Sequence, residues 1–533
     1  MGNSQGGGLR PESGFVLGCG LMAVVLLGLP RPAAPKSKQS AVDWIEMRDQ
    51  HLVYGADEHG NRIPDFSTAG YGGGGVLIPE VPVRATLDPA AAGNDAPRIQ
   101  AAIDALAKQP ADANGFRGVL LLHAGTYRIA GTVLVNASGI VLRGAGTDDH
   151  GTILVAQGSP HTVVRVGGTG RWERDGTQRA IVDEYVPIGA DTVTVDDARD
   201  VQVGDRVIVE WAMNAAWIHA VGMDRIPPRK DGRGIRQWEP GMSLRFDRRV
   251  AGVQGNRVRL DAALTNAMTR GEAATLWKYK FAGRVAQAGV ENLRSDGTAF
   301  EKSKGFSDPE FLTSGDNPQF VGGGYFDSVF VAFDSVEDAW MRNVALTHYT
   351  GLVKVDQFAR AITIEDVNAD HVETGFTHAP PQAFSLAGQQ TLVQRCNLTG
   401  AYSHAWATQA RVAGPNVFRQ CTAKGEKMDA GPHQRWGTGT LYEQLKIQGR
   451  IAIQNRGNMG TGHGWAGANN VLWNCEAESY LVESPPVAYN WAFGTKGSVE
   501  GPGPGNPPGI VVSPGKHVLP ESLYEEQLRG RKR

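Results

Sequence analysis

The chain has 533 residues, of which 53 are Lys or Arg and 55 are Asp or Glu, so its formal net charge is −2. Charges this closely balanced give no general attraction to nucleic acid or to an anionic membrane, and an acidic ligand would need a local group of basic side chains. We therefore expect no nucleic-acid partner. Nothing in the sequence indicates a protein partner, and we expect a monomer.

The N-terminal segment has the features of an export signal. Arg10 precedes a mostly apolar run over residues 15–29, and residues 30–35 are rich in Pro and Ala. The run is shorter than the roughly 20 residues that cross a membrane as a helix. Residues 1–38 are therefore predicted to be a secretory signal peptide or an uncleaved anchor, which places the protein in the periplasm, at the cell surface or outside the cell.

The next segment divides into an irregular part and a helix. Residues 39–80 are polar and glycine-rich, which predicts a lead-in without long helices or strands. Asp95 can cap a helix and Pro97 suits its first turn. Apolar residues then recur on one helical face, at Ile99, Ile103 and Leu106. A short amphipathic helix is predicted over residues 95–107.

Brief β-rich runs separated by glycine turns follow this helix, over residues 118–129, 132–135 and 139–146. A helix followed by GVLLLHAGTYRI and GIVLRGAG resembles the opening of the pectin-lyase-like proteins. The resemblance implies an all-β fold, a right-handed parallel β-helix or solenoid whose first coil is capped by the short helix. It implies little about chemistry, because that superfamily includes lyases, hydrolases, epimerases and phage tailspikes.

Residues 182–281 interrupt this pattern. Runs at 191–195, 205–210 and 248–260, the last with a turn near Gly255, are typical of antiparallel hairpins. We predict an inserted β-rich subdomain that separates a first part of the β-helix, 81–181, from a main part, 282–485. The loop over residues 211–238 is rich in basic and aromatic side chains, which either reach over a sugar groove or belong to a solvated loop with buried tryptophans.

From residue 286 onward a repeat can be counted. An apolar residue or cysteine ends each copy of the repeat. These residues are Leu293, Val344, Val367, Cys396, Cys421, Leu445 and Cys475. The distances along the chain from each one to the next are 51, 23, 29, 25, 24 and 30 residues. Spacings of this size are typical of stacked β-helix coils. The three cysteines are then equivalent inward residues that act as small hydrophobes, and neither a disulfide framework nor a zinc site is indicated. The tail, 486–533, is rich in Gly and Pro and then charged, so we expect no further coil there.

Histidine is concentrated on these coils, and six of the 13 lie between His348 and His463. Counted from the repeat position, His378, His404, His433 and Arg456 have offsets of 11, 8, 12 and 11 residues. Neighbouring coils lie about 4.8 Å apart, so residues at similar offsets form a ladder on one face. A single histidine in a β-helix loop is more often a hydrogen-bonded structural residue than a catalyst, but the cluster favours a functional site.

The predicted site is built from glycine-rich segments that carry His, Arg and Trp. The candidate catalytic residues are His404, His433, His463, Arg435, Arg456 and Tyr402. The candidate substrate-binding residues are Trp406, Gln409, Trp436, Asn455, Trp465 and His378. The two arginines could instead pair with Glu426, Asp429 or Glu443, and the tryptophans could simply cover strand ends.

These residue types fit β-elimination from a uronic acid. That reaction needs a group that neutralises the carboxylate, a base for the C5 proton and a donor to the leaving O4 oxygen, and Arg, His and Tyr suit these tasks. A glycoside hydrolase instead needs two facing carboxyl groups. Asp370, Glu373, Glu426 and Asp429 are available, but they form no compact acidic pair.

The segments GPHQRWGTGTLYEQ and NRGNMGTGHGWAGANNVLWNC also resemble uncharacterised bacterial secreted members of the pectate-lyase-like superfamily. The chain lacks the Trp-Ile-Asp-His motif of the calcium pectate lyases, and Trp340–Asn343 is its nearest counterpart. Calcium is therefore possible but not supported, and no other cofactor or metal is expected. The sequence predicts a secreted polysaccharide lyase. A hydrolase of the same fold acting on an acidic polysaccharide, and a non-catalytic glycan-binding β-helix, remain as alternatives.

Overall fold

The computed structural model describes residues 43–49, 51–301, 328–371, 382–400 and 402–531, apart from the side chains of residues 426 and 427. The described part belongs to one compact unit that begins at Asp43. The predicted signal segment 1–38 and the candidate residue His378 lie outside the described residues.

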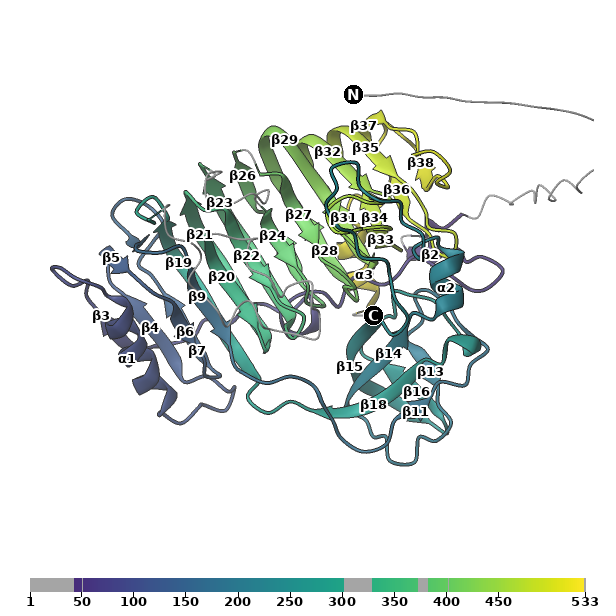
Figure 1. Cartoon of the computed structure of the whole chain (residues 1–533). Helices are drawn as coiled ribbons and strands as arrows, with labels where there is room; N and C mark the ends of the chain where they lie inside the picture. The colour runs from purple at the N-terminus through teal and green to yellow at the C-terminus, as the bar shows by residue number, and fades with distance from the viewer. Residues whose placement is uncertain (1–42, 50, 302–327, 372–381, 401, 532–533) are drawn as a thin grey trace, which may run out of the picture. The chain divides into compact units, whose positions relative to one another are not determined.

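Parallel strands stack coil upon coil into three ladders (Figure 1). The first ladder contains β3 (Val83–Leu87), β4 (Gly118–Leu122), β7 (Ile140–Arg143), β25 (Leu392–Gln394), β28 (Asn416–Arg419), β31 (Thr440–Glu443), β34 (Val471–Trp473), β36 (Trp491–Phe493) and β38 (Ile510–Val512). Three long strands contribute to both the first and the second ladder, namely β19 (Val285–Asp296), β21 (Val336–Thr347) and β23 (Arg360–Asp370).

The second ladder continues through β5 (Gly125–Ile129), β8 (Thr152–Ala156), β26 (Asn397–Thr399), β29 (Thr422–Pro432), β32 (Lys446–Ile453), β35 (Glu476–Val482) and β37 (Lys496–Val499). The third contains β6 (Val133–Val135), β9 (Thr162–Gly167), β20 (Val329–Asp334), β22 (Gly351–Val355), β24 (Gln382–Leu386) and β27 (His404–Thr408), and then the ends of β29, β32 and β35. This is the predicted right-handed parallel β-helix. Inward apolar side chains from all three ladders form one continuous core.

The predicted repeat positions are in register. Leu293 pairs with Val344, and Val344 pairs with Val367. Cys396, Cys421 and Cys475 occupy the equivalent positions of later coils. They form no disulfide bonds with one another and are fully buried, as predicted. The residue before each repeat position has a left-handed φ of 50° to 57°, which turns the chain from the first ladder to the second: Asn292, Asn343, Asp366, Arg395, Gln420, Gln444 and Asn474.

The predicted capping helix is α1 (Ala96–Ala107). Asp95 precedes it and Pro97 lies in its first turn. Its buried face contains Ile99, Ile103 and Leu106, which join the apolar core of the coils. The helix therefore covers the first coils, as the sequence predicted.

The chain leaves the β-helix after β9 and returns at β19, and an antiparallel subdomain lies between. Its strands are β10 (Glu173–Arg174), β11 (Arg179–Ala180), β12 (Tyr185–Val186), β13 (Thr192–Thr194), β14 (Arg206–Ala212), β15 (Ser243–Gln254), β16 (Arg257–Leu260), β17 (Met268–Thr269) and β18 (Thr275–Lys280), with the short helices α2 (Ala215–Ala220) and η2 (Arg270–Glu272). The subdomain begins at Glu173, before the predicted boundary at 182, because β10 pairs with the last strand β18. A two-residue strand is too short to show an alternating pattern.

A buried ionic group holds this subdomain against the coils. Asp247 on β15 is 1% exposed and lies 2.9 Å from the Arg284 guanidinium and 3.1 Å from that of Arg360. The Tyr279 hydroxyl donates to Asp247 at 2.6 Å. Because Arg360 lies on β23, the network fixes the subdomain on the β-helix core.

The tail corrects the prediction that no coil follows residue 485. β37 pairs with β35 and β38 pairs with β36, so the stacking continues to Val512. Strands of three and four residues suffice here, and they leave the Gly- and Pro-rich segment between them as a loop. The charged end forms α3 (Leu523–Arg531).

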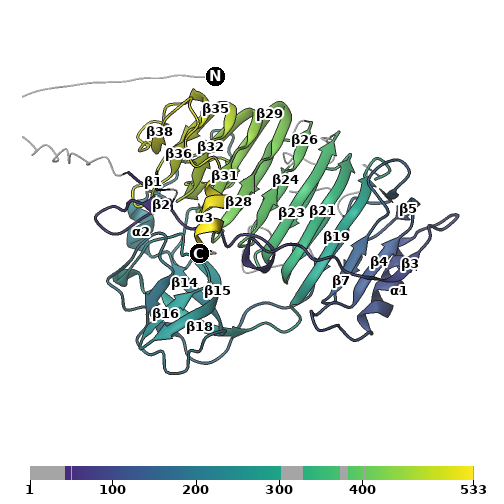
Figure 2. The same ribbon diagram turned by 180° about the vertical axis from the view of Figure 1, so that it is seen from behind.

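The lead-in contains the hairpin β1 (Ile45–Arg48) and β2 (His51–Tyr54) and a single turn η1 (Tyr71–Gly73). Figure 2 shows the segment after β2 crossing the ladders towards β3. The Tyr71 amide donates to Thr363 Oγ1 at 2.8 Å, and the Tyr524 hydroxyl of α3 donates to the Ala69 carbonyl at 2.7 Å. The lead-in therefore packs on β23, and α3 packs on the lead-in.

Candidate active site

Three histidines from successive turns place their imidazole rings next to one another, with interplanar angles of 50° and 65°. His404 begins β27, His433 directly follows β29, and His463 lies in the loop between β32 and the short strand β33 (Gly467–Ala468), which pairs with β30 (Gly437–Thr438). The ring centroids of His404 and His433 are 4.8 Å apart, as are those of His433 and His463. The structure therefore brings together three of the six predicted catalytic residues. We call them the histidine stack.

Coil stacking and glycines bring these rings together. The His433 amide donates to the Thr408 carbonyl at 2.8 Å, and the Arg435 amide donates to the His463 carbonyl at 3.0 Å. Gly460 has a φ of 55°, and a Cβ on it would lie 2.1 Å from the His463 ring. Only glycine combines this backbone with so close an approach.

Gln409 selects the tautomer of His433. The Gln409 amide nitrogen donates to Gln382 Oε1 at 2.7 Å and contacts Ser385 Oγ at 2.8 Å. Its carbonyl oxygen therefore faces His433 Nδ1, 3.2 Å away, and accepts a hydrogen bond from it. The Nε2 atom of His433 then carries the lone pair and can accept a proton.

The stack is neutral at pH 7. Burial, reinforced by the nearby Arg456 charge, lowers the pKa of His404 to about 3 and that of His463 to about 3. Burial and the neighbouring His404 lower the pKa of His433 well below its usual value. Among the described residues, His463 Nδ1 has no hydrogen-bond partner. The stack thus contains unprotonated imidazole nitrogens next to a cation.

Asp429 and Arg456 complete this group of polar residues. The Asp429 carboxylate lies 3.8 Å from His404 Nδ1, and burial raises the pKa of Asp429 to about 6 although Arg456 and Arg450 oppose the shift. Burial lowers the pKa of Arg456, and the nearby Asp429 carboxylate opposes this shift. The Arg456 guanidinium also donates a hydrogen bond to the His433 carbonyl at 3.4 Å. The side chain of Asp429 is 24% exposed, so it forms an accessible edge of the stack.

Sequence reasoning did not select Asp429 as a site residue, although a signal was present. Asp429 lies eight residues after Cys421, and His404 lies eight residues after Cys396. The same offset that identified His404 would have placed Asp429 on the same face of the next coil.

The side chain of Arg435 is buried against the backbone of the loop that carries His463. Its guanidinium donates to the Thr461 carbonyl at 2.7 Å and to the Gly462 carbonyl at 3.2 Å, and the residue is 1% exposed. These contacts hold the loop that carries His463. The predicted role of Arg435 in holding a substrate carboxylate does not fit this placement, whereas Arg456 lies against the stack.

The predicted aromatic residues are in the core. Trp406 and Tyr402 are 0% exposed, Trp436 is 1% and Trp465 is 2% exposed. Trp436 donates to Asn266 Oδ1 at 2.9 Å and Trp465 donates to the Val221 carbonyl at 3.1 Å, because the inserted subdomain covers both rings. Burial raises the pKa of the Tyr402 hydroxyl strongly. Stacking by these tryptophans and proton donation by Tyr402 do not fit these positions.

The inserted loop contacts the loop of His463. Arg229 donates to the carbonyls of Asn458 and Gly460, each at 3.1 Å, and the Arg236 amide donates to the Thr461 carbonyl at 2.9 Å. The tryptophans of the insertion, Trp211, Trp217 and Trp238, are buried. The tryptophans are thus internal, as one of the two predicted alternatives had it, and contact of the loop with a sugar stays a prediction.

The remaining predicted residues have positional roles. The Asn455 side chain accepts from the Gly457 amide at 2.9 Å and begins the turn that leads to His463. Across the described ranges, no group of three or more His, Cys, Asp or Glu side chains is arranged to hold a metal ion. No described helix is long and apolar enough to cross a membrane.

No family model matches the chain, and no curated protein sequence matches it. Solved structures that are similar include the gp54 tailspike of Acinetobacter baumannii bacteriophage AP22 in complex with capsular saccharide, at 10% identity and a TM-score of 0.33, covering 79% of this chain and 64% of that one. The tailspike of E. coli bacteriophage HK620 has 10% identity and a TM-score of 0.36, with coverages of 90% and 71%.

The A-module of a mannuronan C-5 epimerase from Azotobacter vinelandii has 10% identity and a TM-score of 0.30, with coverages of 81% and 97%. The chain thus spans 64% of the length of the AP22 tailspike. At these identities and scores the similarities assign no activity to this chain.

Proposed function

We propose that this protein is a polysaccharide lyase that cleaves a uronic-acid-containing polysaccharide by β-elimination. The observation that carries the proposal is the neutral histidine stack beside Arg456, in which Gln409 leaves Nε2 of His433 free to accept a proton. β-Elimination requires such a base next to a cation that binds the substrate carboxylate.

Each step has a candidate residue. Arg456 binds the carboxylate, and its fixed positive charge makes the adjacent C5 proton more acidic. His433 Nε2 takes that proton, and the negative charge of the bound substrate raises the pKa of the stack towards neutrality. Asp429, with a pKa of about 6, donates a proton to the departing O4 oxygen. The C4–O4 bond breaks and a C4–C5 double bond forms.

Hydrolysis is the second candidate, and Asp429 favours it. A carboxyl group whose pKa is raised to about 6 is typical of the general acid of a glycoside hydrolase. The second carboxylate would be Glu500, which influences Asp429 electrostatically and pairs with Arg450 at 2.8 Å. A water molecule would then attack the anomeric carbon, and no double bond would form.

The test compares His433→Gln and Arg456→Gln with His371→Gln on a polysaccharide that the wild type cleaves. His371 is a matched control, because its side chain is 70% exposed and lies outside the stack. General acid–base catalysis is worth about 10² to 10⁴, so we expect kcat to fall by about 10² or more in His433→Gln and to remain unchanged in His371→Gln. Normal turnover in both stack variants would contradict the proposed site.

A further inference from the structure

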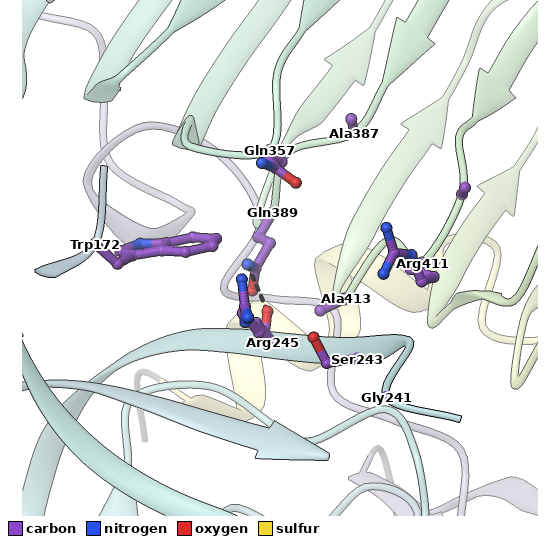
Figure 3. Close-up of a pocket in the computed structure, with 10 residues that line it drawn as sticks. Trp172, Gly241, Ser243, Arg245, Gln357, Ala387, Gln389, Arg411 and Ala413 are labelled. Atoms are coloured by element: carbon purple, nitrogen blue, oxygen red, sulfur yellow. Dashed lines mark hydrogen bonds between the residues drawn. The ribbon is translucent and has the colours of Figure 1, made fainter. Parts of the chain in front are cut away.

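A cavity of about 120 Å³ lies where the inserted subdomain meets the turns of the coils (Figure 3). It has room for several water molecules or for the charged end of a small ligand. Its walls come from Trp172, from Ser243 and Arg245 at the start of β15, and from three successive turns of the β-helix that contain Gln357, Gln389 and Arg411.

The walls of this pocket are fixed by contacts that do not involve a ligand. The Gln389 amide nitrogen donates to the Arg245 carbonyl at 2.9 Å, and Gln389 Oε1 accepts from the Asp247 amide at 3.0 Å. The Trp172 indole donates to Asp247 Oδ2 at 3.1 Å, and its ring packs edge-on against Phe358 at 4.8 Å. The pocket is therefore preformed, and the small side chains around it keep it open.

The charged residues that line this pocket are both cations, Arg245 and Arg411. Glu210 pairs with Arg245 at 2.8 Å and offsets part of its charge. A third cation lies beneath the pocket, because the buried Arg248 donates to Gln389 Oε1 at 3.1 Å and otherwise to backbone carbonyls such as Ala262 and Gly414. Three guanidinium groups at the pocket thus outnumber its two nearby carboxylates, Glu210 and Asp247.

Polar groups suited to a sugar acid face the same space. Figure 3 shows the ring of Trp172, the amide of Gln357 and the guanidinium of Arg411 around the pocket. Within the described part of the chain, Gln357 Nε2 is buried without a hydrogen-bond partner. An amide side chain, an aromatic wall and two guanidinium groups are the features that bind a carboxylate on a sugar ring.

We propose that this pocket binds the carboxylate of a single uronic-acid residue, as a binding site separate from the histidine stack. The site rests on the proposed function only in taking an acidic glycan as the ligand. Ala410 and Arg411 directly follow Gln409, the residue that contacts His433, and the Arg411 amide donates to the Arg435 carbonyl of the next coil at 2.8 Å. The pocket is therefore linked through the backbone to the turn that carries His433.

The test is calorimetric titration of the full chain with galacturonate and glucuronate, with galactose and glucose as neutral probes and with acetate. We expect the uronates to bind at least tenfold more tightly than the neutral sugars and than acetate. Arg411→Gln should weaken uronate binding at least tenfold, because the uronate carboxylate loses a charged hydrogen-bond donor. Ser243→Leu, which fills the cavity, should weaken it equally. Arg199→Gln, at a side chain 90% exposed in the same subdomain, should not.

Equal affinity for uronates and neutral sugars would overturn the proposal, and so would acetate binding as tight as that of the uronates. Wild-type affinity in both Arg411→Gln and Ser243→Leu would also overturn it. His433→Gln separates the two proposals, because it should lower kcat by about 10² or more while uronate still binds. If no polysaccharide is cleaved but uronate binds through Arg411, the lyase proposal alone fails, whereas cleavage without such binding contradicts the pocket alone.

Discussion

At the scale of the residue, the histidine stack links the site to the stability of the fold. An unfolded histidine has a pKa near 6.5, whereas that of folded His404 and of folded His463 is about 3. Unfolding therefore takes up protons between these values. The stabilising contribution is fully present above about pH 6.5 and is lost as the pH falls towards 3. Asp429 acts in the opposite direction, because its raised pKa makes the folded state bind one more proton between about pH 4 and 6.

We therefore expect the His463→Gln variant to unfold with about one proton less taken up at pH 5 than the wild type. The slope of unfolding free energy against pH, measured by denaturant titration between pH 4.5 and 6, should fall by about 1.4 kcal/mol per pH unit. The exposed His371→Gln variant provides the control. An unchanged slope in His463→Gln would show that this imidazole is charged in the folded protein.

Residue offsets predicted part of this site and missed the rest for a definite reason. The repeat fixes which backbone positions stack, so His404 and His433 could be brought together from the sequence. It does not show which outward positions another segment covers. Trp436 and Trp465 each lie next to a glycine, as sugar-binding residues in loops often do. Contacts with Asn266 and Val221, roughly 170 and 240 residues away in the chain, nevertheless bury them.

At the scale of the element, the loop between β32 and β33 is shaped by the need to seat His463. Gly457 and Gly460 both have left-handed backbones, with φ values of 49° and 55°. A Cβ on Gly457 would meet nothing within 4 Å, whereas one on Gly460 would lie 2.1 Å from the His463 ring. A substitution by alanine would therefore strain the backbone at both positions, but only at Gly460 would it also clash with the His463 ring.

We expect Gly460→Ala to lower kcat at least tenfold, because the added methyl group displaces the His463 ring. Gly457→Ala should strain only the backbone and leave kcat unchanged. The two variants should differ by less than about 1 kcal/mol in unfolding free energy, since the loop at Gly460 is exposed and can shift. Turnover and denaturant unfolding of both variants check this. Equal activity of the two variants would mean that the His463 position does not matter for turnover.

Elements that repeat were predictable, and elements that do not repeat were not. The repeat positions matched the observed register because each coil must place one apolar side chain in the same part of the core. The coil formed by β37 and β38 escaped prediction, since Gly and Pro dominate its connecting loop and its strands are only four and three residues long.

At the scale of the whole molecule, the inserted subdomain depends on buried charge. Asp247 carries a negative charge in a site that is 1% exposed, and the Arg284 and Arg360 guanidinium groups hold its pKa well below the usual range. No sequence pattern indicates this network, because its members come from β15, from the segment before β19 and from β23.

We expect Asp247→Asn to lower the free energy of unfolding by about 3 kcal/mol, because two buried guanidinium groups lose their shared counter-charge. Asp231→Asn provides the control, since Asp231 pairs with Arg229 and Arg233 at a side chain that is 41% exposed. Denaturant unfolding of the two variants measures the difference. A loss below about 1 kcal/mol in Asp247→Asn would show that the network does not hold the subdomain in place.

The central claim is that the histidine stack supports elimination from a uronate. The most direct measurement follows wild-type protein on a panel of acidic polysaccharides, recording the ultraviolet absorbance of unsaturated uronate and the number of new reducing ends in the same samples. We predict that one unsaturated uronate appears for each new reducing end on at least one polymer. New reducing ends without ultraviolet absorbance would contradict elimination and establish hydrolysis, and the absence of both signals across the panel would contradict cleavage of acidic polysaccharides.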